Sequence, residues 1–139
     1  MTVIKSIIEW LKGFNSEEYG NMARIDTDIQ SPEVDSFSLV KEPIQNVKRY
    51  ISGRAIYTEH YTIQARLASN EDINRAENQG FGEALEEYVK AMNLAQNYPV
   101  IPEAKVQDIR VTTPFYMGTT NTNNSVYQMT IAIKYEKER

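Results

Sequence analysis

Residues 47–67 decide the fold, and they read VKRYISGRAIYTEHYTIQARL. From position 51 onward most odd-numbered residues are apolar and most even-numbered ones are polar, which is the period of a strand with one buried face. Only Ile56 and Glu59 interrupt this alternation. One strand across the whole stretch would be several times the usual length, and a Ser-Gly pair in its middle is a turn signal. We therefore predict a hairpin in which 46–51 pairs with 54–67.

The segment before this hairpin begins with an amphipathic helix. Apolar residues recur at helical spacing over 1–14, with charged residues of both signs between them. We expect this helix to pack on the sheet, because helices that lie on membranes carry a strongly basic face. Residues 15–35 are expected to be irregular. A short strand at 37–40 should then stop at Pro43 or lie at a sheet edge, since proline cannot donate to a ladder.

The segment after the hairpin alternates between helical and strand patterns. A capping signal at 69–72 opens a helical stretch, and a Tyr-Pro pair ends it. Gly80 and Gly82 are expected to divide this stretch into a short first helix and a longer second one. A second hairpin follows over 106–135, with a polar loop at 118–124 as its exposed tip.

This element order indicates the fold class. The order α-β-β-β-α-β-β predicts an α+β domain in which an antiparallel or mixed sheet is covered by helices. The chain has 139 residues, which is the usual size of one domain, so we expect a single domain over 1–139.

Composition excludes several kinds of site. The chain has no cysteine, so disulfides, thiolate metal sites and a cysteine nucleophile are ruled out. The apolar N-terminal segment is too short to cross a bilayer, and we expect no membrane partner. The net charge of −4 does not suit a protein that wraps nucleic acid with its surface.

Residues that could carry chemistry are few and scattered. His60 is the one histidine, and with Glu59 and Arg66 it forms the one conceivable nucleus of a catalytic or ligand-binding site. Asp26 and Asp28 lack the spacing of a calcium loop, and Glu86 and Glu87 lie beside the apolar stripe of a helix, where we expect a solvated face. The Gly80-Phe81-Gly82 triplet lacks the third glycine of a phosphate-binding fingerprint. We therefore predict no catalytic, cofactor-binding or metal-binding residues, no cofactor, and no enzymatic activity.

Three short segments and their order carry a resemblance to a known family. Tyr50-Ile51-Ser52-Gly53 leads into the long alternating strand, Asn78-Gln79-Gly80-Phe81 precedes the central helix, and Tyr98-Pro99 follows it. With the last strands, this pattern covers roughly residues 36–135. It resembles the minor capsid and tail-terminator (tail-completion) proteins of long-tailed bacteriophages and prophages.

The resemblance implies a structural virion protein made in the cytoplasm of the host bacterium. Such proteins form a ring, commonly a hexamer, at the head-proximal end of the tail. The ring ends polymerisation of the tail tube and helps join the tail to the head. The implied partners are further copies of the chain, the major tail-tube protein and a head-completion protein. Genome DNA would pass through the ring without specific binding, and an acidic lumen would suit that passage.

Interface residues are expected on strand 54–67 and on the tip 118–124. They are Arg54, Tyr57, Tyr61, Thr119, Asn121, Asn123 and Asn124. The tip is either a solvated loop or a segment that becomes ordered on meeting a partner. Two alternatives stay open: a head–tail joining or tail-tube subunit, and a small ligand-binding domain or enzyme.

Overall fold

The computed structural model describes residues 2–16, 20–22, 25–27, 36–69, 71–120 and 124–138. Its elements are α1 (Val3–Leu11), β1 (Asn15–Ser16), β2 (Gly20–Asn21), β3 (Ile25–Thr27), β4 (Ser36–Arg49), β5 (Arg54–Ala68), α2 (Asp72–Leu94), β6 (Ala104–Thr120) and β7 (Asn124–Glu138). This order matches the expected one except for short strands within 15–27. The expectation of an irregular segment was therefore wrong for β1, β2 and β3, and the rest of 15–35 lies outside the described residues.

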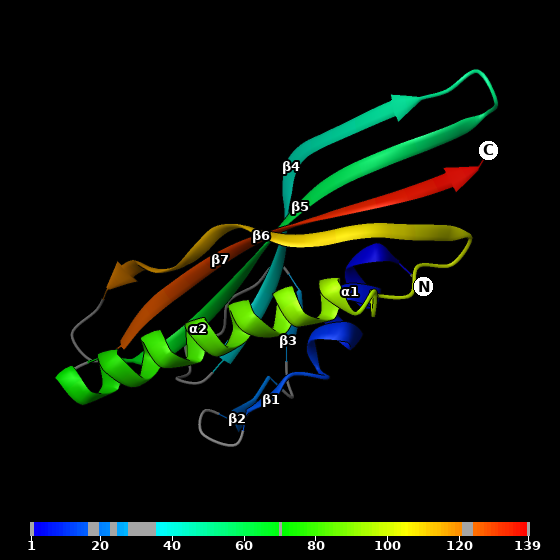
Figure 1. The fold of residues 1–139 in the computed structure, drawn as a ribbon. Coiled ribbons are helices and arrows are strands. Elements are labelled where there is room, and N and C mark those ends of the chain that lie inside the picture. The colour runs from blue at the N-terminus through cyan, green and yellow to red at the C-terminus, as the bar shows by residue number, and fades with distance from the viewer. Residues whose placement is uncertain are drawn as a thin grey trace.

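One sheet organises the molecule. Its strand order is β3-β4-β5-β7-β6. β3 runs parallel to β4, whereas the other neighbouring strands are antiparallel, so the sheet is mixed. Both helices lie on the same side of it (Figure 1). The predicted α+β class, with a helix-covered sheet, is confirmed.

The predicted β4–β5 hairpin is present, but β4 is longer than expected. Gly53 forms the turn with a φ of 94°, a backbone conformation that favours glycine. β4 does not stop at Pro43; it continues with a register shift between Lys41 and Gln45. Among the described residues β3 pairs with 37–39, and Pro43 lies beyond them, inside the register shift, on what is there an edge strand. Its missing N–H group therefore costs no ladder hydrogen bond, and the alternative of an edge position is confirmed.

The alternation in β5 sorts its side chains as the sequence predicts. Ile63 and Ala65 are buried under the helices, and the residues paired with them on β7, Met129 and Tyr127, are buried too. Burying large apolar side chains contributes about 1.5–3 kcal/mol each, so this layer supplies much of the stability. The opposite face carries mostly polar side chains.

α2 is one continuous helix, so the expected division at Gly80 and Gly82 was wrong. Gly82 serves packing instead: a Cβ added there would lie 2.2 Å from the ring of Phe115. The ring can thus rest directly on the helix backbone. The capping prediction also needs correction, because the N-cap is Glu71 and makes no side-chain capping bond. Ser69 instead shares a 2.7 Å hydrogen bond between hydroxyl groups with Ser125.

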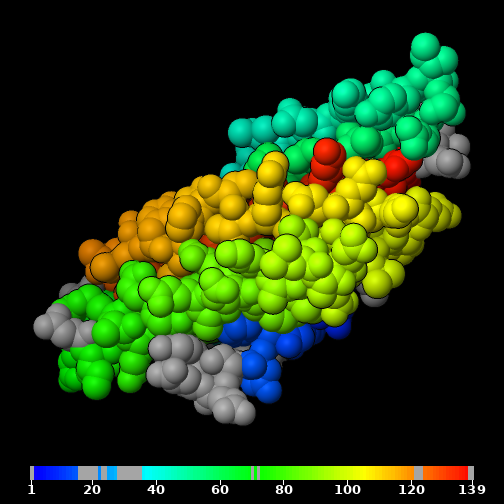
Figure 2. Space-filling view, in the orientation of Figure 1, coloured from blue at the N-terminus to red at the C-terminus, as the bar shows by residue number. Residues whose placement is uncertain are grey.

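The molecule is elongated and has two distinct ends (Figures 1 and 2). One end is the tip of the β4–β5 hairpin; we call residues 44–58 the arm. The other end holds the start of α2 and the β6–β7 hairpin tip. β5 runs from one end to the other, and its 15 residues span roughly 45 Å.

Candidate assembly surfaces

The described members of the predicted interface set, apart from Tyr61, lie at the two ends of the molecule. Arg54 and Tyr57 belong to the arm, whereas Thr119 and Asn124 belong to the β6–β7 hairpin. Asn121 and Asn123 lie outside the described residues. The set therefore marks two surfaces rather than one.

Arg54 and Tyr57 are held in place by neighbouring side chains. The Arg54 guanidinium donates to Glu136 across 2.9 Å and lies 5.3 Å from the centre of the Tyr50 ring. The Tyr57 ring stacks on Tyr135 with their centres 5.3 Å apart. These contacts fix the side chains of Arg54 and Tyr57 against neighbouring residues.

Part of the predicted loop 118–124 belongs to strands. Gly118, Thr119 and Thr120 belong to β6, and Thr119 is paired with Val126. Asn124 opens β7, and its side-chain oxygen accepts a hydrogen bond from Arg66 at 2.8 Å. Whether the tip becomes ordered on binding stays a prediction, because 121–123 lies outside the described residues.

Tyr61 lies in the core and not at the surface, being 1% exposed. Its hydroxyl donates to the carboxylate of Glu59 across 3.1 Å. Glu59 breaks the alternation of β5 and is itself 2% exposed. Gln45 donates to the same carboxylate, and Lys41 lies 3.1 Å from it. The buried charge thus has several partners, as buried charges require.

The tyrosines beside Glu59 are held in their neutral form. Burial raises the pKa of Tyr61 well above its ordinary value, and the negative charge of Glu59 and the hydrogen bond to it raise it further. The pKa of Tyr135 is raised for the same reasons, burial first, and its hydroxyl also bonds to Glu59. We call Glu59 and its four partners, Lys41, Gln45, Tyr61 and Tyr135, the Glu59 cluster. It fastens β4, β5 and β7 together at the base of the arm.

The conceivable nucleus of His60, Glu59 and Arg66 is not brought together. His60 and Glu59 are neighbours on β5 and therefore point to opposite faces of the sheet. Arg66 shares the face of His60 but lies six residues farther along, a separation of roughly 20 Å. The Nδ1 atom of His60 is buried and, among the described residues, has no hydrogen-bond partner.

The outer edge of β6 is covered by α2. The backbone N–H of Phe115 donates to Glu86 across 2.7 Å, and that of Ile109 donates to Asn93 across 3.1 Å. Pro114 has no N–H group to offer. Exposed strand edges attract other strands, and proteins commonly block them by such a cover. β6 is therefore poorly suited to pair with a strand of another molecule.

The outer edge of β4 is blunted in another way. Beyond the residues paired with β3 it contains Pro43 and the register shift beside it. Lys48 and Arg49 are exposed nearby. Proline, irregular register and exposed cations all discourage strand addition. The described edges therefore favour contacts through side chains.

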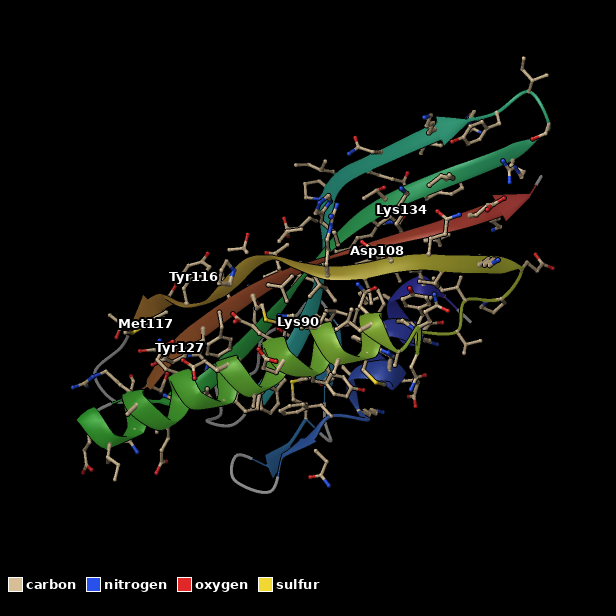
Figure 3. The ribbon with its side chains drawn as sticks, viewed as in Figure 1. Lys90, Asp108, Tyr116, Met117, Tyr127 and Lys134 are labelled. Carbon is tan, nitrogen blue, oxygen red and sulfur yellow. The ribbon has the colours of Figure 1, made fainter. Side chains whose placement is uncertain are left out.

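The arm offers such a side-chain surface on the sheet face that the helices leave open. A recess of about 240 Å³ is lined by Asn46, Val47, Lys48, Tyr50, Ile56, Thr58 and Lys134. Ile51, at the turn, is fully exposed, whereas the side chain of Val47, which pairs with Tyr57, lies on the other face of the arm. Lys134 projects from β7 at the base of the arm (Figure 3). The arm itself carries three basic residues and no acidic one.

The opposite end of the molecule carries the opposite charge. Residues 71–87 contain six acidic residues and one basic residue. Glu77, Glu83 and Glu87 are exposed on α2, and Ile73 is 62% exposed beside them. On β6, which lies beside α2, Tyr116 is 45% exposed, and its ring extends away from α2 (Figure 3).

Paired carboxylates do not form a metal site among the described residues. Glu86 is directed to the backbone of β6, while the adjacent Glu87 is exposed. Asp26 lies in β3, and Asp28 is outside the described residues. No group of three or more potential metal ligands is found in the part of the chain that the structure describes. Within that same part, none of the helices is long and apolar enough to span a membrane.

No protein-family model and no curated protein matches this chain. The geometry of its surfaces is therefore the ground for inferring what it does.

Proposed function

We propose that the chain is a structural virion protein of a long-tailed phage or prophage that caps the head-proximal end of the tail tube. As a ring, it ends tube polymerisation and helps join the tail to the head. The opposite charges of two distant surfaces of the molecule are the observation that carries this proposal. The arm is basic with exposed apolar residues, and the start of α2, roughly 45 Å away, is acidic.

Two oppositely charged surfaces at the two ends of one molecule favour a ring, because the basic surface of one copy can bind the acidic surface of the next. When two different surfaces of one molecule are complementary, copies join in series, and the series closes if the rotation between copies is right. The covered edge of β6 and the blunted edge of β4 support the same view, since they leave side-chain contacts as the means of association.

A tail-tube subunit is the nearest alternative, and its mode of assembly differs. Tube subunits stack ring upon ring, whereas a terminator adds one layer and stops. The length of assembled tubes is therefore the informative quantity.

The test uses the major tail-tube protein of the phage or prophage whose genome encodes this chain. Tube protein is polymerised with rising amounts of the chain, and tube lengths are measured by electron microscopy. A terminator shortens the tubes and stops their growth at saturating amounts. Tubes of unchanged length, or growth of tubes built from the chain alone, would refute the proposal.

A further inference from the structure

We infer that the arm of one copy docks on the acidic outer face of α2 in the next copy. This inference names the contact within the ring and so rests on the proposed function. The predicted interface set includes Arg54 and Tyr57 on the arm but no residue of α2, so the helix face is the new half of this contact.

The two surfaces are complementary in charge, and each exposes apolar atoms. Tyr50 and Ile56 are the apolar side chains of the recess on the arm, and Asn46, Lys48 and Lys134 are among its polar ones. An apolar side chain flanked by carboxylates would fill such a recess.

The outer face of α2 provides that combination. Ile73 is 62% exposed, and Glu77 follows it one helical turn later, on nearly the same side. Glu83 and Glu87 extend the acidic surface along the helix, and all three carboxylates are exposed. Complementary charge steers two surfaces together and fixes their register, while the apolar contact contributes affinity.

A second copy must supply the partner surface. The arm and the start of α2 lie at opposite ends of the molecule (Figure 1), at the two ends of β5. The arm therefore cannot fold back onto its own helix. Each copy presents one arm and one acidic helix face, so every contact leaves both molecules with one further surface to use. Such contacts propagate from copy to copy, and they form a ring when the rotation between copies closes the series.

Cysteine trapping tests the contact directly, because the chain has no cysteine of its own. A variant that carries both Asn46→Cys, on the face of the arm that holds the recess, and Ile73→Cys should give a ladder of disulfide-linked oligomers under mild oxidation. Either single variant can give dimers at most. The matched control pairs Asn46→Cys with Leu94→Cys, which lies at the far end of α2 and is 77% exposed. A ladder from the Ile73 pair that exceeds the control at least tenfold is expected, and equal yields would overturn the inference.

Charge reversal then asks whether the acidic and basic groups form this contact. Lys48→Glu with Arg49→Glu reverses the arm, and Glu77→Lys with Glu83→Lys reverses the helix face. In the trapping background, either reversal should lower the ladder yield about tenfold. Reversing both surfaces in one chain, or mixing the two reversed proteins, should restore it. If the yield of the ladder is the same in both charge-reversed variants as in the trapping background, the assigned contact is contradicted.

The basic arm could also attract DNA or an anionic membrane, and the same variants decide this. If the arm variant loses binding to duplex DNA or to phosphatidylserine vesicles while no ladder forms in any variant, the inference is wrong. The outcome is separable from the proposed function. A chain without the ladder that still shortens tail tubes refutes only the contact, and one with the ladder that leaves tubes unchanged refutes only the terminator role.

Discussion

Replacing Glu59 with leucine should destabilise the chain strongly, even though leucine suits a buried position. The substitution leaves the hydroxyls of Tyr61 and Tyr135 and the amide of Gln45 without their acceptor. An unsatisfied buried polar group costs about 1–3 kcal/mol. The buried charge itself is costly, and its removal returns part of that loss. We expect the free energy of unfolding to fall by about 3 kcal/mol, or the melting temperature by about 10 °C.

The assay is urea unfolding followed by circular dichroism, together with calorimetry. Glu83→Leu is the matched control, because its carboxylate is exposed on α2; it should change stability by less than about 0.5 kcal/mol. Adding Tyr61→Phe and Tyr135→Phe to Glu59→Leu removes the stranded hydroxyls. This triple variant should recover to within about 1 kcal/mol of the wild type. The reasoning fails if Glu59→Leu is as stable as the wild type, or if the triple variant is no more stable than Glu59→Leu.

Three other outcomes are expected. Gly82→Ala should cost about 1–2 kcal/mol in chemical unfolding, because the clash with Phe115 outweighs the higher helix propensity of alanine; a more stable variant would show that the ring moves aside freely. Glu86→Ala should cost about 1 kcal/mol and raise light scattering on storage, since it uncovers an edge N–H of β6, whereas Glu86→Gln keeps an acceptor and should behave as the wild type does. Above about pH 10 the unfolded chain releases tyrosine protons more readily than the folded one, so stability should fall by up to about 1.4 kcal/mol per pH unit for each of Tyr61 and Tyr135. Thermal melts from pH 9 to pH 11 should show a shallower fall in a double Phe variant, and equal slopes would contradict the raised pKa values.

The sequence predicted the sheet well because its pattern is local. The alternation over 54–67 identified both the strand and its buried face, and the Ser-Gly signal located the turn at Gly53. The exceptions to the alternation proved informative. Glu59 interrupts the apolar face because it is the acceptor of a buried polar cluster, and a single sequence gives no signal for the partners that reach it from β4 and β7.

The failed predictions depended on neighbours that are distant in sequence. Pro43 and Gly82 are both breakers by local rules. Pro43 is tolerated because the residues paired with β3 end before it, and Gly82 is needed because a ring from β6 rests on the helix. The cover over the edge of β6 likewise joins residues more than a dozen positions apart. Local patterns therefore located strands and faces but not which edges are available for assembly.

The surfaces were half predicted for the same reason. Turn and loop signals marked Arg54 at the arm and Thr119 at the β6–β7 tip, which the structure places at opposite ends of the sheet. The acidic face of α2 had no such signal, because exposed carboxylates on a helix are ordinarily solvated. The acidic face of α2 becomes a candidate contact surface because it lies at the end of the molecule opposite the basic arm.

The central claim is that this chain closes one end of a tail tube as a single ring. Cryo-electron microscopy of tubes assembled with the chain tests it most directly. The account predicts one layer of the chain at one end of each tube, with the arm of each copy resting on α2 of its neighbour. Copies spread along the tube wall, found at both ends, or stacked in successive layers would contradict it.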